Sequence, residues 1–303
     1  MTAANRSGIL LIDKPQGVTS HDVVARTRKR AGTRKVGHAG TLDPMATGLL
    51  VLGINSSTRL LTYLVGLDKE YFATIRLGAS TSTDDAEGET LHTAPTHSLA
   101  AVDPADIAAG LSSLSGVVSQ VPSSVSAIKV DGKRAYAMAR AGETVELAAR
   151  TVTIRALELL DTRAADGFLD LDVRVECSSG TYIRAIARDL GANLGVGGHL
   201  TALRRTKVGP FSVSDAAELE TLDVANSLLG PAGVASRLFP VYELSTAEAV
   251  DLGHGKRLDA IRPVEGDGPV AAIAPDGRLV GLIEFTGQVA KPLVNFPTDE
   301  VLS

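Results

Sequence analysis

"FLDLDVRVECSSGTYIRAIARDLG", residues 168–191, changes its hydrophobic period halfway along. Up to Cys177, apolar and polar residues alternate strictly, which predicts a strand with one buried face. Four apolar residues then follow at helical spacing: Ile183, Ile186, Ala187 and Leu190. Thr181 is expected as the N-cap of this helix and Gly191 as its stop. The stretch therefore predicts a half-buried strand followed by an amphipathic helix.

Three segments before this stretch predict further strands. "GILLIDKPQGVTS" (8–20) is typical of a buried strand that ends in a turn, and "GLLVLG" (48–53) of a second strand. "EYFATIRLG" (70–78) alternates, which places Tyr71, Ala73, Ile75 and Leu77 on one face. Strands and helices do not alternate regularly along the chain. We therefore expect an α+β fold with a mixed, largely antiparallel sheet and flanking helices.

The character of the chain changes near residue 240. A proline break is followed by a capping box from Ser245 to Glu248 and by a short helix that ends at Gly253. "PVAAIAPDGRLVGLIEF" (269–285) predicts two apolar strands around a Pro-Asp-Gly turn. We therefore expect one domain over residues 1–239 and a small β-rich domain over residues 240–303.

Composition favours an ordinary globular protein. Hydrophobic residues make up 44% of the chain and charged residues 21%. No apolar run approaches the ~20 residues of a membrane span, and the first residues do not have the pattern of a secretory signal. The single cysteine, Cys177, rules out an internal disulfide and is expected to be buried. These features predict a cytoplasmic protein without contact to a membrane.

Positive charge is concentrated in two places, although the net charge is −5. "RTRKRAGTRK" (26–35) holds six basic residues, and "LRRTK" (203–207) holds three. A helix is expected over 20–31, with Ser20 near its N-cap and Gly32 beyond its end. On that helix Arg26, Lys29 and Arg30 share one face, opposite Val24, Thr27 and Ala31. The basic face is either an ordinary solvated surface or a local patch that contacts phosphates.

Several chemistries lack their motifs. The chain has no Gly-x-Gly-x-x-Gly after a strand and no Gly-Lys-Ser/Thr loop, so dinucleotide and nucleoside-triphosphate chemistry are not supported. One cysteine and scattered histidines do not give the spacing of a zinc site. "SAIK" (126–129) matches the Ser-x-x-Lys motif of penicillin-recognising hydrolases, but the Lys-Thr-Gly partner motif is missing.

A turn-rich stretch, "GHAGTLDPMATGLL" (37–50), contains one carboxylate, Asp43. An aspartate before a proline most often forms an Asx-turn or a cap. The other interpretation is nucleophilic catalysis, which requires an ionised carboxylate, a low pKa and a nearby cation. Arg184 is a plausible cation, because the apolar stripe of the predicted helix would fix it. Composition and spacing leave both interpretations open.

Longer blocks of the chain resemble the TruB family of tRNA pseudouridine-55 synthases. The resemblance covers roughly residues 8 to 210, and its blocks stand in the order of the family. They are "LLIDKPQGVTSHDVV" (10–24), "GHAGTLDPMATGLL" (37–50), "KEYFATIRLGASTSTDDAEGE" (69–89), "QVPSSVSAIKVDGKRAYAMARAGE" (120–143), "VECSSGTYIRAIARDLG" (175–191) and "HLTALRRTKVG" (199–209). Several long motifs in one order are far more specific than the four-residue match.

The resemblance implies a pseudouridine-synthase fold with a central cleft and a C-terminal PUA-type RNA-binding domain. It implies that the chain converts uridine 55 in the T loop of tRNA to pseudouridine after flipping the base out. In this interpretation Asp43 is the nucleophile, Tyr71 stacks on the target base, and Arg184 pairs with Asp43. If this pair lies in a water-poor cleft, we expect the planar fork of Arg184 to hold the carboxylate bidentately. Three departures from the family pattern are mild: Ala39, Thr41, and Ser179 where lysine is common.

Further residues are implied as substrate contacts. They are His38, Lys14, Asp85, Tyr182 and Leu203. His38 would contact an RNA phosphate or shape the flipped loop, and Leu203 would line the pocket. Lys14 is also a candidate support of the loop. Asp85 has two alternatives, capping a turn or orienting active-site groups.

The implied reaction is an isomerisation, so neither a cofactor nor a metal is expected. The expected partner is the T arm of tRNA, bound by a monomer without an obligate protein partner. Two other functions remain open: an RNA-folding helper, and a guide-RNA-dependent synthase that works with partner proteins. The chemical path also remains open, since the carboxylate could attack the ribose C1′, add to the base, or assist glycal formation.

Overall fold

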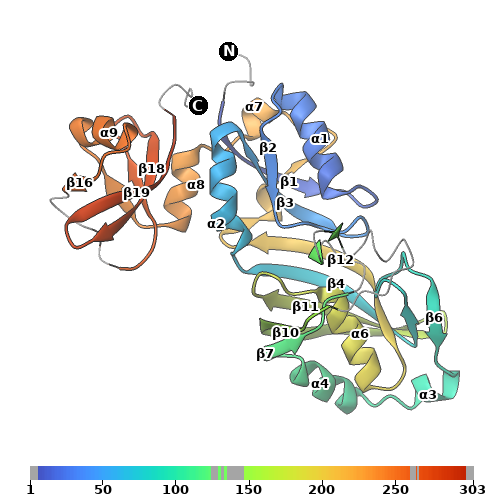
Figure 1. Ribbon diagram of the computed structural model, residues 1–303. Helices are drawn as coiled ribbons and strands as arrows, with labels where there is room; N and C mark the ends of the chain where they lie inside the picture. The colour runs from blue at the N-terminus through green and yellow to red at the C-terminus, as the bar shows by residue number, and fades with distance from the viewer. Residues whose placement is uncertain are drawn as a thin grey trace.

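A ten-stranded mixed sheet forms the larger part of the molecule (Figure 1). The computed structural model describes residues 6–123, 129–130, 133–134, 147–259, 264 and 266–297. The Ser-x-x-Lys match at 126–129 and much of the 120–143 block therefore lie outside the described residues. The main strands, in sheet order, are β14 (Ala217–Glu218), β1 (Gly8–Lys14), β3 (Thr47–Ile54), β12 (Gly198–Val208), β4 (Lys69–Leu77), β11 (Phe168–Cys177), β10 (Arg150–Ala165) and β7 (Gly116–Gln120). At the sides, β2 (Val36–Ala39) pairs with β3 and β13 (Phe211–Ser212) with β12.

All neighbours in this sheet are antiparallel except β1–β14 and β3–β12, which agrees with the expected sheet. The β3–β12 junction is short and pairs only Thr47 with Arg204 and Gly48 with Arg205. Gly48 has a φ of 98°, and a Cβ there would lie 2.2 Å from the carbonyl oxygen of Arg205. Only glycine fits at this point, because both the backbone conformation and the close approach exclude a side chain. The junction brings the loop before β3 next to β12.

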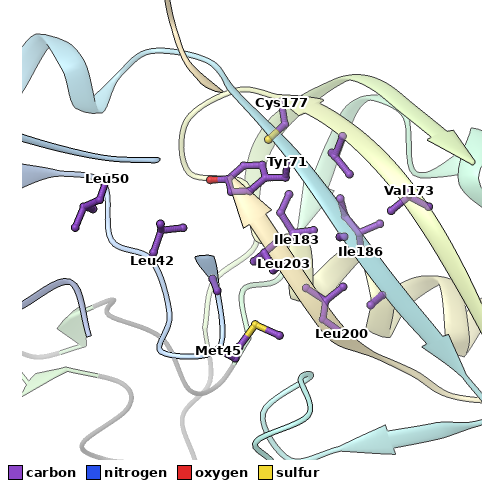
Figure 2. Close-up of a cluster of buried hydrophobic side chains, with 14 of the residues drawn as sticks. Leu42, Met45, Leu50, Tyr71, Val173, Cys177, Ile183, Ile186, Leu200 and Leu203 are labelled. Atoms are coloured by element: carbon purple, nitrogen blue, oxygen red, sulfur yellow. The ribbon is translucent and has the colours of Figure 1, made fainter. Parts of the chain in front are cut away.

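The alternation expected for β4 and β11 is confirmed. Their buried face contributes Ile75, Val173 and Val175, none of them exposed, to one large apolar cluster. Figure 2 shows this cluster around Tyr71, with Ile183 and Ile186 from the following helix packed beside the sheet. Cys177 is also buried, and this burial raises the pKa of its thiol to about 11. The thiol thus stays protonated and packs as an apolar group.

Helices and short strands complete the larger part. The helices are α1 (Ser20–Ala31), α2 (Leu61–Val65), α3 (Thr96–Ala100), α4 (Pro104–Ser113), α6 (Ile183–Asn193), α7 (Val224–Ser227) and α8 (Pro231–Leu238). Short 3-10 turns cover Asn55–Leu60 and Val213–Asp215. Two small hairpins are formed by β5 (Ala79–Thr81) with β6 (Thr90–Thr93), and by β8 (Lys129–Val130) with β9 (Lys133–Arg134). Within the described part of the chain, no helix is long and apolar enough to cross a membrane.

The helix expected over residues 20–31 is confirmed as α1, with Ser20 as its first residue. Thr19 is its N-cap and forms a capping box with Asp22. Gly32 ends the helix in the left-handed conformation, at a φ of 66°. The predicted inner face is confirmed, since Val24, Thr27 and Ala31 are buried.

Both ends expected for α6 were wrong. Tyr182 is the N-cap residue, because the hydroxyl of Thr181 donates to the carbonyl of Ser178 at 3.0 Å and does not cap the helix. The helix passes through Gly191 and ends at Asn193. A Cβ at Gly191 would lie 2.1 Å from the backbone nitrogen of Gly198. This glycine therefore allows α6 to approach the start of β12, and does not end the helix.

A second, five-stranded sheet begins after α8. Its order is β15 (Val241–Glu243), β17 (Val270–Ile273), β18 (Leu279–Thr286), β19 (Val289–Asn295) and β16 (Leu258–Asp259). The predicted hairpin, the Ser245–Glu248 capping box and α9 (Thr246–Gly253) are confirmed. One apolar cluster joins this sheet to α8 and to the back of β1 and β3. The two parts therefore share one apolar cluster, and a further cluster lies within the second part alone.

Candidate active site

A cavity of about 400 Å³ opens beside the β3–β12 junction. Its walls come from loop 40–43, from turn 178–184, and from inward-facing residues of β4 and β12. In Figure 2 the ring of Tyr71 points from β4 toward the loop that carries Leu42. Leu203 and Ile183 lie next to this ring. Both Tyr71 and Leu203 are 8% exposed and line this cavity, as the stacking and pocket roles expected for them require.

The loop that carries Asp43 is held by main-chain and side-chain bonds. Its ends close on each other through a bond from the Ala46 N–H to the Asp43 carbonyl at 3.1 Å. The hydroxyl of Ser20, on α1, donates to the carbonyl of Leu42 at 3.1 Å and accepts from its N–H at 2.9 Å. The Gly17 N–H donates to the carbonyl of Pro44 at 2.8 Å. The Asp43 carboxylate, 36% exposed, lines the cavity from this fixed position.

The side chain of Arg184 lies between two carboxylates. Its Nε is 3.1 Å from Oδ2 of Asp43, so the contact expected between these residues is present. Its Nη1 is 3.2 Å from Oδ2 of Asp85 and donates to the Thr83 carbonyl at 2.8 Å. The arginine fork is thus divided between two carboxylates, and the bidentate grip on Asp43 alone was wrong. Arg184 is buried at 4% exposure, which fixes this geometry.

Asp85 lies behind Arg184, away from the solvent. Its side chain is 3% exposed. One of its oxygens accepts from the Thr83 hydroxyl and from the Glu87 N–H, and the other contacts Arg184. This burial does not fit the substrate contact expected for Asp85. It agrees with both alternatives, because Asp85 accepts from the Glu87 N–H within its own turn and also contacts Arg184, which it can orient.

Burial raises the pKa of the Asp43 carboxyl above its ordinary value. Arg184 and Lys14 oppose this effect, and the charge of Asp85 adds to it. The low pKa expected for Asp43 was therefore wrong in direction, because the site removes more hydration than its cations replace. A carboxylate that has lost hydration is a stronger nucleophile than a hydrated one.

Lys14 supports the Asp43 loop from below. Its side chain is fully buried, and its ammonium donates to the carbonyls of Val18 at 2.7 Å, Pro15 at 3.0 Å and Pro44 at 3.3 Å. Burial lowers the pKa of Lys14 to about 8. Three bonds to main-chain carbonyls use all of its donors. The structure therefore favours the supporting role over the substrate contact that was also expected.

Of the two remaining residues expected to contact the substrate, Tyr182 lines the cavity and His38 does not. Tyr182 lines the cavity, and its main chain is paired with the amide of Gln120 at 2.8 and 3.0 Å. His38 lies on β2, is not among the residues that line the cavity, and packs edge-to-face on His21 at 5.7 Å between ring centroids. The structure thus brings Asp43, Arg184 and Tyr71 together and leaves His38 outside their cavity.

Sequence reasoning missed two buried cations of the cavity wall. Lys69 and Arg205 both line the cavity and are 6% and 1% exposed. The alternation of the strands could have found them, because Lys69 precedes Tyr71 by two residues and Arg205 follows Leu203 by two. Residues two apart in a strand share a face.

The basic residues of α1 are exposed, as both alternatives for this face require, but several basic residues of the two segments have partners within the protein. In 203–207, Arg205 is buried, Arg204 pairs with Asp13 at 2.6 Å, and Lys207 pairs with Glu70 at 3.2 Å. On α1, Arg26 pairs with Glu220 at 2.7 Å, and Arg30 donates to the carbonyls of Glu220 and Leu222. These contacts reduce the positive charge available to a phosphate. Lys29 forms no hydrogen bond or ion pair with another described residue.

Comparison with known proteins assigns the chain to a class. The N-terminal domain of TruB family pseudouridylate synthases matches residues 28–183. The C-terminal domain of tRNA pseudouridylate synthase B matches residues 184–232, and the C-terminal region of tRNA pseudouridine synthase II matches residues 239–297. The chain is a pseudouridine synthase that belongs to the TruB family.

Relatives cover almost the whole chain. The tRNA pseudouridine synthase B of Leifsonia xyli subsp. xyli (strain CTCB07) is 64% identical over 297 residues, which are 97% of this chain and 98% of the relative. The enzyme of the same name from Arthrobacter sp. (strain FB24) is 56% identical, with the same coverage. A chain in a solved Cbf5–Nop10–Gar1 complex superimposes with a TM-score of 0.71 at 23% identity. That superposition covers 98% of this chain and 87% of the other, and it confirms the fold.

Proposed function

We propose that the chain converts uridine 55 in the T loop of tRNA to pseudouridine. The observation that carries this proposal is the position of Arg184, which holds Asp43 at the wall of a cavity that also contains Tyr71. The relatives at 64% and 56% identity, which are named for action on tRNA, support the class of substrate.

The reaction breaks the bond between N1 of uracil and C1′ of ribose, turns the base, and joins C5 to C1′. A proton leaves C5 and N1 ends with a hydrogen, so the atoms balance within the nucleotide and no redox cofactor is required. The uridine must first leave its stack, which costs a few kcal/mol. Stacking on Tyr71, worth about 1–3 kcal/mol, offsets part of that cost.

Asp43 acts as the attacking carboxylate, and Arg184 keeps it ionised and aimed. Its partial exposure at the cavity wall makes it reachable by a flipped nucleotide, whereas Asp85 is sealed behind the arginine. Leu42, Leu203 and Ile183 give the cavity an apolar part that holds the detached uracil. Such a wall keeps water from the intermediate until the new bond forms.

Other residues have supporting roles. Lys14 anchors the loop of Asp43, Asp85 orients Arg184, and Tyr182 and Leu203 contact the nucleotide. His38 contacts the RNA outside the cavity or shapes its loop. We also propose that residues 1–239 form the catalytic domain and residues 240–303 a PUA-type RNA-binding domain of a cytoplasmic monomer. Light scattering of the purified protein tests the monomer.

The decisive test is incubation of the purified chain, without other proteins or RNAs, with an unmodified tRNA transcript. Pseudouridine is then mapped along the product. We expect modification at position 55 by the wild type and none by Asp43→Asn. Absence of pseudouridine with the wild type would contradict the proposal. An effect on tRNA folding that persists in Asp43→Asn would instead point to the RNA-folding helper.

A further inference from the structure

Two buried cations of the cavity wall have no acidic partner among the described residues. Lys69, at the start of β4, and Arg205, on β12, are 6% and 1% exposed and line the same cavity as Asp43. Neither forms an ion pair with any carboxylate of the described residues. Burial of an ion without a counter-ion is costly, so such a pair of cations calls for an explanation.

Main-chain carbonyls satisfy part of their hydrogen-bonding capacity. The ammonium of Lys69 donates to the carbonyl of Val65 at 2.6 Å and also to that of Leu67. Arg205 donates through Nε to Leu49 at 2.7 Å and through Nη2 to Gly40 at 3.1 Å. These bonds use two of the three lysine donors and two of the five arginine donors. Carbonyl dipoles orient the two cations, but they do not cancel their charge.

The two cations lie close to each other and to Tyr71. A Cβ built on Gly40 would lie 3.4 Å from Nη1 of Arg205 and 4.0 Å from Cε of Lys69, so both side chains face the same glycine. The charge of Arg205 also acts on Tyr71, whose pKa it lowers against the larger, opposite effect of burial. Burial, and next the positive charge of Arg205, lowers the pKa of Lys69 to about 8. An anion placed between them would relieve this repulsion.

The charge of the whole cavity points in the same direction. Among the described residues that line it, Lys69, Arg150, Arg184 and Arg205 are cationic, and Asp43 is the one carboxylate. Uracil is neutral and would leave this excess of positive charge unbalanced. The phosphodiester groups that flank a flipped nucleotide carry the missing negative charge.

We propose that Lys69 and Arg205 form a phosphate subsite that binds a phosphodiester of the target nucleotide itself, beside the base stacked on Tyr71. The inference rests on the proposed function, since it needs a flipped nucleotide in the cavity. It assigns a binding role to the two cations that sequence reasoning missed. The subsite anchors the nucleotide by its backbone while the glycosidic bond is open and the base is detached.

The test uses T-arm hairpin RNAs in which one linkage is an uncharged methylphosphonate. The linkage is replaced on the 5′ side of the target uridine, on its 3′ side, or in the stem as a control. We expect one of the two flanking replacements to weaken binding to the wild type by about 10- to 100-fold, the scale of a hydrogen bond to a charged group. The stem replacement should have a much smaller effect.

Lys69→Gln removes the charge and retains a donor for the Val65 carbonyl, so it should fold. We expect it to bind the unmodified hairpin as weakly as the wild type binds the sensitive methylphosphonate RNA, and to lose no further affinity with that RNA. Lys69→Arg, which keeps the charge, should restore the sensitivity in part. Lys207→Gln is the matched control, because Lys207 is half-exposed, paired with Glu70, and outside the cavity lining.

Two outcomes would overturn the subsite. Equal sensitivity of wild type and Lys69→Gln to every replaced linkage would show that Lys69 only caps the end of α2. No sensitivity of the wild type at either flanking linkage would remove the phosphate altogether. Pseudouridine formation on the unmodified hairpin is measured in the same samples. If the wild type forms pseudouridine while the affinities show no coupling, the subsite fails and the proposed function stands.

Discussion

Two loops each carry an aspartate that contacts Arg184, and the two aspartates have different surroundings. Loop 40–46 carries Asp43, whose side chain is 36% exposed at the cavity wall. Turn 82–88 carries Asp85, whose side chain is 3% exposed and accepts bonds from the Thr83 hydroxyl and the Glu87 N–H. Arg184 contacts both, at 3.1 and 3.2 Å. The two carboxylates thus lie at nearly the same distance from Arg184, but one is partly exposed and the other is buried.

The difference separates a group that reacts from a group that positions. The hydrogen bonds of Asp85 satisfy its charge within the protein, so it is suited to fixing Arg184 and is a poor nucleophile. Asp43 lost hydration without comparable compensation, and burial raises its pKa. The main chain on either side of Asp43 is fixed, because Ser20 donates to the carbonyl of Leu42 and Lys14 donates to that of Pro44. The carboxylate of Asp43 itself lines the cavity. Rigidity of the loop and reactivity of the side chain therefore have separate structural origins.

The largest expected effect comes from Asp43→Asn, which keeps the shape and removes the negative charge. We expect the single-turnover rate to fall by on the order of 10⁴- to 10⁶-fold, the scale for loss of a nucleophile. Binding of tRNA should persist, because most contacts go to the RNA backbone. The rate and a binding titration are measured side by side, and mass spectrometry confirms the asparagine. Multiple turnovers by an intact Asp43→Asn sample would contradict the nucleophile role.

Arg184→Lys should have the next largest effect. A lysine keeps the charge but lacks the planar fork that reaches both carboxylates. We expect the single-turnover rate to fall by about 10²- to 10³-fold, as for loss of one preorganised donor, with little change in tRNA affinity. The pH at which activity appears should rise, because a weaker contact leaves burial and Asp85 to raise the pKa of Asp43 further.

A matched control for this variant is Arg76→Lys. Arg76 holds Asp170 through two bonds at 2.7 and 2.8 Å, outside the cavity lining. Its replacement should change the thermal midpoint and leave the rate unchanged. If Arg184→Lys reacts at the wild-type rate but binds tRNA weakly, Arg184 is a phosphate contact and its pairing with Asp43 has no catalytic meaning.

Asp85→Asn should reduce the rate by about tenfold, the lower end for loss of a charged hydrogen bond. Removal of one partner from a buried ion pair should also lower the free energy of unfolding by about 3 kcal/mol. The pH effect should be opposite to that of Arg184→Lys. The charge of Asp85 raises the pKa of Asp43, so without it the ionised nucleophile should persist to lower pH.

A pH profile of the single-turnover rate and a thermal melt give both readouts for Asp85→Asn. This experiment also distinguishes a positioning role of Asp85 from a role as the nucleophile. If Asp85 itself attacked the nucleotide, the asparagine variant would lose activity at every pH. An activity profile that moves toward higher pH would contradict the electrostatic effect of Asp85 on Asp43.

Sequence reasoning reached the parts of this site that local patterns encode. Strict alternation placed Tyr71 on a buried face, and helical spacing after Gly180 placed Arg184 near the start of a helix. The sequence did not predict that Arg184 divides its fork, because the turn of Asp85 meets α6 only through the tertiary fold. It also did not predict the raised pKa of Asp43, since desolvation depends on residues from several strands. The fold class could be predicted because strands such as β4 and β11 alternate on their own and the runs of β1 and β3 are continuously apolar.

Helix ends show the same limit on a smaller scale. Gly191 has the residue type of a stop, yet α6 runs through it because β12 lies 2.1 Å from the position of its missing Cβ. The ion pairs of the two basic segments could not be predicted for a similar reason. Their partners, such as Asp13 for Arg204 and Glu220 for Arg26, are about 190 residues away in the sequence.

The smallest expected effect comes from Thr83→Val, which removes the hydroxyl that donates to Asp85 and leaves the main-chain carbonyl that accepts from Arg184. Valine has nearly the same shape, so the change isolates one hydrogen bond. We expect the free energy of unfolding to fall by about 1 kcal/mol and the rate to fall by only a few-fold, since Arg184 keeps both carboxylates. Thr83→Ser retains the hydroxyl and serves as the control. Thermal melts and single-turnover rates are compared for the three proteins. If Thr83→Val slows the reaction as much as Asp85→Asn while Thr83→Ser does not, the position of Asp85 depends on this hydroxyl more than on its ion pair with Arg184. The turn around Asp85 would then be held by its own hydrogen bonds, as the loop around Asp43 is.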